Sequence, residues 1–162
     1  MQKRIVLLLV ALAVAVLALL ASGQSKPLAA SADGQSLEGS WVGVVMLDSP
    51  PPGVPERFLN LATFMPDGGF ITSTGSISDS LGHGSWVRTG NRQFAVTCLG
   101  LSYGADGATE YTFKMRAKLA YTESGWELVG PFIVDTLDAT GKVVFSATGT
   151  TRCFHIDVEK MP

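Results

Sequence analysis

The feature that most constrains this chain is a strict alternation of apolar and polar side chains over residues 109–121. The apolar set is Tyr111, Phe113, Met115, Ala117, Leu119 and Tyr121, and the polar set between them is Glu110, Thr112, Lys114, Arg116 and Lys118. Successive side chains of a strand point to opposite faces, whereas a helix needs apolar residues three and four positions apart. The alternation therefore predicts a long strand with one buried face and one solvated face.

Other short apolar runs, separated by turns rich in Gly, Asn and Asp, bring the expected number of strands to eight. The predicted strands are 40–47, 58–65, 70–74, 83–89, 93–103, 109–121, 125–137 and 142–157. Short connections join sequential neighbours, and closure removes the exposed edges of the sheet. The prediction is an all-β, eight-stranded antiparallel up-and-down barrel over residues 39–162. The two longer connections, 48–57 and 75–82, are expected to be loops at a barrel mouth.

The N-terminus carries Lys3 and Arg4, followed by an apolar run from Ile5 to Ala21 and the small residue Gly23. This order is typical of a secretory signal helix, which we predict over residues 1–23, with a flexible leader at 24–38. The alternative is an uncleaved membrane anchor, because the run is only slightly shorter than a spanning helix of about 20 residues. The expected location is periplasmic or extracellular.

The charge balance excludes several classes of protein. The whole chain has a net charge of −2, and removal of residues 1–23, which carry two basic and no acidic residues, makes it −4. A mildly acidic domain repels nucleic acid phosphates, so no nucleic acid partner is expected. The apolar content is too high for a disordered chain.

Gly39-Ser40-Trp41 on the first predicted strand, taken with Arg152 on the last, resembles the lipocalin and wider calycin pattern. In that superfamily a first-strand Gly-x-Trp packs against a basic residue of the final strand. The resemblance implies that Gly39, Trp41 and Arg152 close one end of the barrel, with the guanidinium stacked on the indole.

Longer stretches resemble a group of small exported bacterial proteins of calycin-like type that have no assigned activity. These stretches are Phe64-Met65-Pro66-Asp67-Gly68-Gly69, Gly82 to Gly90, Phe94-Ala95-Val96-Thr97 and Thr148-Gly149-Thr150-Thr151-Arg152. Cys98 and Cys153-Phe154-His155 depart from that pattern. The resemblance supports a barrel and transfers no catalytic residue.

Two cysteines, Cys98 and Cys153, suggest a disulfide in an exported protein. They fall on the fifth and eighth predicted strands, three strand spacings apart, whereas a disulfide needs Cα atoms within about 7 Å. Two buried free thiols are therefore favoured. His83 and His155 lack the spacing of a metal site, so neither a metal nor another cofactor is expected.

The residues expected to contact a ligand are Trp41, His83, Trp86, Tyr111, Phe113, Met115 and Phe132. The inward-facing members of this set form either a packed core or the wall of a pocket, because eight strands enclose little spare volume. The favoured hypothesis is an exported calycin-like barrel that binds a small apolar molecule. One alternative is a barrel enzyme of the cyclase or isomerase type, for which Glu110 and His83 are the residues to check. The other is a filled barrel that contacts partners through its outer face.

Overall fold

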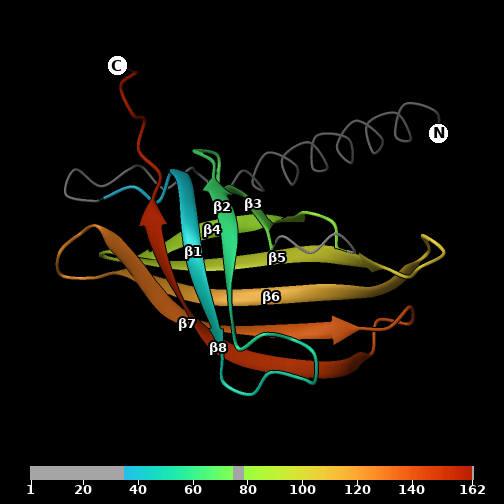
Figure 1. Cartoon of the computed structure of the whole chain (residues 1–162). Helices are drawn as coiled ribbons and strands as arrows, with labels where there is room; N and C mark the ends of the chain where they lie inside the picture. Colours follow the sequence, from blue (N-terminus) through green and yellow to red (C-terminus); the bar gives the residue numbers. More distant parts are fainter. Residues whose placement is uncertain (1–34, 75–78, 162) are drawn as a thin grey trace, which may run out of the picture. The chain divides into compact units, whose positions relative to one another are not determined.

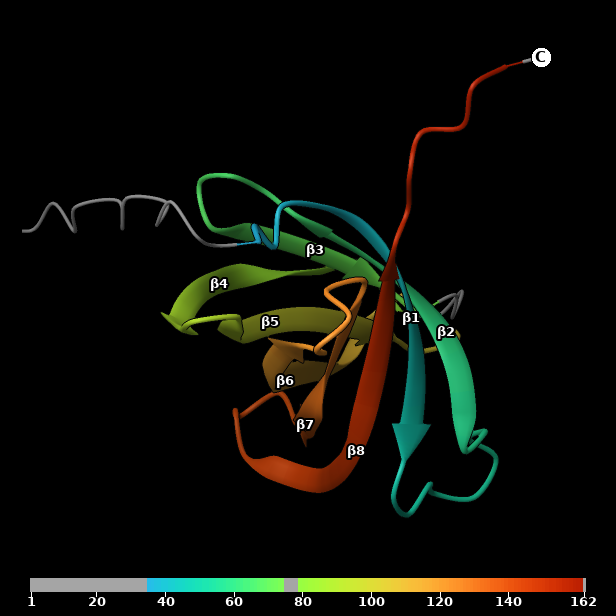
Figure 2. The same ribbon diagram turned by 90° about the vertical axis from the view of Figure 1, so that its left-hand side faces the viewer.

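The structure, a computed structural model, describes residues 35–74 and 79–161. It is a closed barrel of eight strands in chain order (Figure 1). The strands are β1 (Gly39–Leu47), β2 (Arg57–Phe64), β3 (Gly69–Ser73), β4 (Gly82–Gly90), β5 (Gln93–Tyr103), β6 (Thr109–Tyr121), β7 (Glu127–Leu137) and β8 (Val143–His155). Every neighbouring pair is antiparallel, and β8 pairs with β1 to close the ring, as Figure 2 shows. The predicted up-and-down barrel is confirmed. The predicted signal helix and most of the leader lie outside the described residues.

The connections follow the turn chemistry expected from the sequence. Gly68, Gly107, Gly125 and Gly141 all have positive φ. In the β5–β6 turn the Asp106 carboxylate accepts a hydrogen bond from the Ala108 amide at 3.0 Å. Such aspartates stabilise a turn by bonding the backbone two residues on, so their role here is structural.

Because neighbouring strands are antiparallel, successive connections lie alternately at the two ends of the barrel. One end, here called the closed end, carries the start of β1, the end of β8 and the β2–β3, β4–β5 and β6–β7 turns. The other, here called the loop end, carries the β1–β2, β3–β4, β5–β6 and β7–β8 connections. Figure 1 shows β5 to β8 reaching beyond the short β3 at the loop end. Of the predicted 75–82 loop, residues 75–78 lie outside the described part of the chain.

The core occupies the inside of the ring. On β6, Ala117 and Leu119 are buried while Arg116 and Lys118 are exposed, so the predicted alternation is confirmed. The buried apolar residues form one cluster that draws on every strand except β4, whose half-buried Trp86 packs against it.

Candidate functional site

The closed end is filled by aromatic rings in a continuous series of contacts. The rings belong to Trp41, Tyr121, Phe94, Trp86, Phe64 and Phe70, and neighbouring ring centroids are 4.7–6.3 Å apart. Most of these contacts are tilted or edge-to-face, a geometry that stabilises aromatic pairs beyond their area of burial. Since Trp41 and Phe94 are almost fully buried, this end of the barrel is packed core.

Residues 35–38, which the sequence assigned to the flexible leader, complete this end as part of the folded domain. The Leu37 side chain is fully buried, and the Trp41 indole N–H donates to the Leu37 carbonyl at 3.1 Å. The Tyr121 hydroxyl donates to the Ser36 carbonyl at 2.7 Å, and the Arg88 guanidinium donates to the Gln35 carbonyl at 2.6 Å. Residues 35–38 therefore form a plug, and the folded domain extends to Gln35.

The predicted stacking of Arg152 on Trp41 is wrong. Arg152 faces Val44 across the β1–β8 pair and points outward, where its Nε donates to the Glu127 carboxylate at 2.5 Å. The residue opposite Trp41 is His155, whose ring lies edge-on to the indole with centroids 5.0 Å apart. The physical reason is that side chains alternate between the two faces of a strand. Odd-numbered residues of β8 therefore point inward, and Arg152 points outward.

A hollow of about 200 Å³ opens beside the plug at the closed end. Its lining includes Glu38, Trp41, Tyr121, Trp126 and His155. Trp126 lies in the β6–β7 connection and is 76% exposed, and the His155 Nδ1 lies 2.7 Å from a carboxylate oxygen of Asp157. The predicted seventh strand, 125–137, includes Trp126. The strand instead begins at Glu127, which leaves the indole free of the core.

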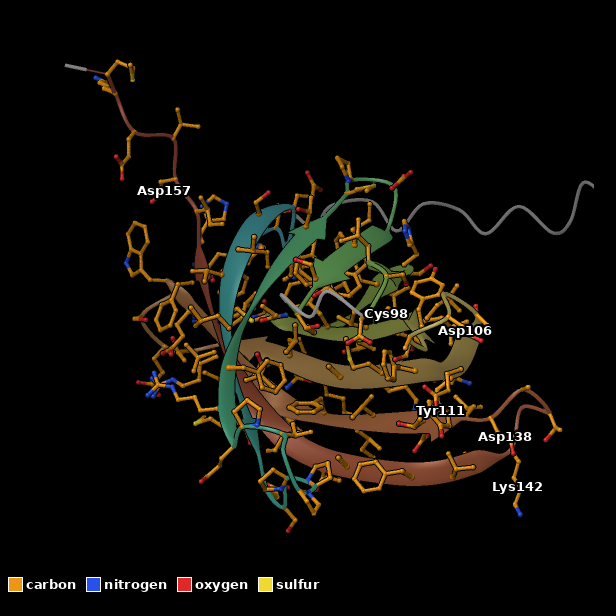
Figure 3. The ribbon with its side chains drawn as sticks, turned by 45° about the vertical axis from the view of Figure 1, so that its right-hand side comes forward. Cys98, Asp106, Tyr111, Asp138, Lys142 and Asp157 are labelled. Atoms are coloured by element: carbon orange, nitrogen blue, oxygen red, sulfur yellow. The ribbon has the colours of Figure 1, made fainter. Side chains whose placement is uncertain are left out.

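The loop end differs because its inward-facing apolar side chains stay partly accessible to solvent. Tyr111 and Phe113 share the inner face of β6 with Met115, and all three are half-buried. Phe145 lies opposite Thr136 on the same inner face and is 41% exposed. Figure 3 shows Tyr111 at the end that carries the turns with Asp106 and Asp138. Tyr111, Phe113 and Phe145 lie outside the buried core cluster and form an apolar lining at this end.

Two glycines lie beside this lining, and Gly100 of β5 pairs directly with Phe113 of β6. Gly82 and Gly100 are buried on the inner faces of β4 and β5. A Cβ on Gly100 would meet the Phe113 ring at 3.5 Å, which is ordinary van der Waals contact. A Cβ on Gly82 would lie 2.9 Å from the Thr72 methyl carbon, so neighbouring side chains cover both glycines.

The remaining predicted ligand contacts separate into two groups. Trp41 and Phe132 are buried in the core, and Trp86 is half-buried with its indole N–H donating to the Met65 carbonyl at 3.0 Å. His83 lies on the outer face of β4 between Ile71 and Leu99, so it does not face the barrel mouth as expected. Glu110 is likewise exposed, on the outward-facing side of β6, so neither residue considered for an enzyme reaches the interior.

The two cysteines are free and buried, as the strand assignment favoured. Burial raises the pKa of the Cys98 thiol to about 11 and also raises the pKa of Cys153. Figure 3 shows Cys98 within the ring of strands, away from the turns at either end. Within the described part of the chain, no three His, Cys, Asp or Glu side chains gather to hold a metal ion.

Sequence reasoning missed Leu37, Glu38, Trp126, His155 and Phe145. The turn Glu123-Ser124-Gly125 directly before Trp126 was the available signal for its exposure, because a tryptophan at a turn tip has little to pack against. No comparable signal marked Leu37, since the adjoining Gln35 and Ser36 are held by residues 53 and 85 positions away.

The fold defines a closed, eight-stranded, up-and-down β-barrel protein with one sealed end and one partly open end. Comparisons with protein-family models, with curated proteins and with solved structures found no match. Among the residues that the structure describes, no helix is long and apolar enough to cross a membrane.

Proposed function

We propose that this protein is an exported calycin-like barrel that binds a small apolar molecule at its loop end. The observation that carries the proposal is the contrast between the two ends. Leu37 and the aromatic cluster seal one end, whereas Tyr111, Phe113 and Phe145 at the other are apolar, face inward and remain accessible. Apolar side chains gathered in a concave wall are typical of ligand sites in barrels of this size.

The apolar area that must be buried on binding limits the kind of ligand. Micromolar affinity needs about 8 kcal/mol, which at about 25 cal/mol per Å² corresponds to burial of roughly 330 Å² of apolar surface, before any entropic cost. Three half-exposed aromatic side chains supply only part of that area, so the ligand must contribute a large apolar surface of its own. A flexible hydrocarbon chain or a fused-ring lipid meets this requirement.

Two loops border the loop end and are suited to control entry. Residues 48–56 connect β1 to β2, and Val54 within them is 41% exposed. Leu81 is 50% exposed, and the preceding Ser80 exchanges hydrogen bonds with Leu101 of β5 at 2.8 and 2.9 Å. Exposed apolar side chains on both loops favour contact with an apolar ligand on its way in.

Binding is tested by titration with Nile red and then by displacement of the dye with fatty alcohols of increasing length. The variant Phe113→Asp places a charge on the inner wall, and Val87→Asp places the same charge on the outer face, where Val87 is 59% exposed. We expect saturable binding by the native protein, at least about tenfold weaker binding by Phe113→Asp and an unchanged affinity for Val87→Asp. Absence of saturable binding, or equal affinity in both variants, would refute the proposal.

Export is tested separately by determination of the mature N-terminus. We expect cleavage after Gly23, so that mass spectrometry of protein from the exported fraction gives a chain beginning at Gln24. A full-length chain in the membrane fraction would favour the uncleaved anchor instead.

A second candidate function is self-association through the outer face of β1, β2 and β8. Val42 pairs with Leu61 on one side and with Phe154 on the other, and Val44 pairs with Leu59. Leu59, Leu61 and Phe154 are 61%, 55% and 43% exposed, so these neighbours form an apolar patch. Sedimentation velocity checks this candidate: a dimer that Leu61→Glu dissociates supports it, and a monomer at every concentration excludes it.

A further inference from the structure

The hollow at the closed end is separate from the apolar lining at the loop end and has a different chemistry. We propose that it binds a small organic cation, a quaternary ammonium compound free in solution. The inference is independent of the function proposed above, since the two sites lie at opposite ends of the barrel.

Two accessible rings, Tyr121 and His155, line the hollow and are supported by the buried indole of Trp41. The Trp41 and Tyr121 rings are 6.0 Å apart and inclined at 59°, and the His155 ring lies at 81° to the indole of Trp41. Trp41 is held by its bond to the Leu37 carbonyl, and Tyr121 by its bond to the Ser36 carbonyl. The Tyr121 and His155 rings are therefore held in place at the hollow, where aromatic surface attracts an ammonium group.

Trp126 supplies a further aromatic surface that the fold itself does not use. Its side chain is 76% exposed and has no ring partner among the described residues. A large apolar side chain left in water at the rim of a hollow gains free energy when a ligand covers it. The indole is also the aromatic group that attracts cations most strongly.

Among the described residues that line the hollow, Glu38 supplies a carboxylate and none is Lys or Arg. Glu38 lines it and makes no ion pair within residues 35–74 and 79–161, and Asp157 adds a second carboxylate behind His155. Two guanidinium groups lie close to the hollow but are bonded to backbone carbonyls. Arg88 donates to the Gln35 carbonyl and lies 4.9 Å from the centroid of the Phe94 ring, and Arg92 donates to the Thr122 carbonyl. Glu38 is thus the charged group that lines the hollow.

The size of the hollow limits the ligand further. About 200 Å³ is below the roughly 300–1,000 Å³ of sites that hold drug-sized molecules. A trimethylammonium group with a short tail fits such a space, whereas a nucleoside or a sterol does not. Because quaternary ammonium groups lack N–H donors, recognition needs aromatic faces and a carboxylate and requires no directed acceptor.

The test is isothermal titration of the full protein with choline and with its neutral carbon isostere, 3,3-dimethyl-1-butanol. We expect choline to bind and the isostere to bind at least about tenfold more weakly, because only choline carries the charge. Methyl glucoside serves as a third ligand, since an exposed tryptophan can also stack on a sugar ring. Equal binding of the isostere, or binding of the glucoside without choline, would overturn the proposal.

Two variants test whether choline binds in the hollow. Trp126→Ala and Glu38→Gln alter exposed side chains, and circular dichroism confirms that each variant is folded. We expect Glu38→Gln to weaken choline about fivefold while leaving the isostere unchanged, and Trp126→Ala to weaken choline about tenfold. The matched control, Val87→Ala on the outer face of β4, keeps the native affinity. Choline affinities unchanged in both variants would place the site elsewhere and refute the proposal.

Discussion

At the scale of single residues, a shift of one position on a strand decides which chemistry a side chain can take part in. Arg152 and Cys153 are adjacent on β8, yet Arg152 pairs with Glu127 in solvent while Cys153 is buried. The same alternation sends His83 outward on β4 and Trp86 inward. The resemblance to the calycin pattern implied that Arg152 packs on Trp41, but the residue that pairs with Trp41 is His155.

The thiols yield a prediction at this scale. Because the thiolate is the reactive form and burial raises the pKa of Cys98 to about 11, we expect neither cysteine to react with Ellman's reagent at pH 8 in the folded protein. In guanidinium chloride without reductant, both thiols become exposed and two equivalents react per chain. A chain that stays unreactive in denaturant contains a disulfide and contradicts the structure.

At the scale of elements, glycines set how closely the strands of the inner wall approach one another. A Cβ on Gly84 of β4 would lie 1.9 Å from the Thr97 carbonyl oxygen of β5. This contact is with backbone, so no side chain can rotate away to relieve it. Gly100 also lies on the inner wall but has space for a methyl group.

The two glycines form a matched pair for mutation. We expect Gly84→Ala to lower the free energy of unfolding by about 2 kcal/mol or more, because the strands must separate. Gly100→Ala is expected to change it by less than about 1 kcal/mol, since an added methyl group meets the Phe113 ring and the Gly82 backbone at ordinary van der Waals distances. Urea denaturation followed by tryptophan fluorescence measures both values. A reversed order would show that the packing of β4 on β5 is described wrongly.

The strands were easier to predict than the plug and the hollow that their side chains help to form. Alternation and turn residues gave all eight strands, since both are local signals. The plug could not be predicted, because Leu37 looks like any apolar residue in a polar leader until its partners on β1, β4 and β6 are brought together. The same limit applies to the hollow, whose lining comes from the plug, β1, the end of β6, the β6–β7 turn and the end of β8.

At the scale of the whole molecule, the first and last strands are neighbours. Trp41 faces His155, and Leu47 faces Gly149. Both ends of the barrel's chain therefore reach the closed end, and no strand of the ring is left with an unpaired edge.

This closure predicts that the chain tolerates circular permutation. We expect a permutant with new termini between Asp106 and Gly107, and a short glycine-serine linker from Met161 to Gln35, to keep the native circular dichroism spectrum and a midpoint of thermal unfolding within about 10 °C. The cut lies in an exposed turn at the loop end. A second permutant, opened between Met115 and Arg116 within β6, is the control and should not fold. Failure of the first permutant would contradict the closed ring.

The pairing of β1 with β8 also has a consequence for how the chain reaches its native state. The Thr148 hydroxyl bonds the Asp48 carboxylate across 100 residues of sequence, and Gln35 bonds the Gly125 carbonyl across 90. Contacts this distant form late, because most of the chain must first be ordered between them. During synthesis, one edge of β1 stays bare until the last strand emerges. We expect the nascent chain to be most prone to aggregate in that interval, because an unpaired strand edge can pair with another chain.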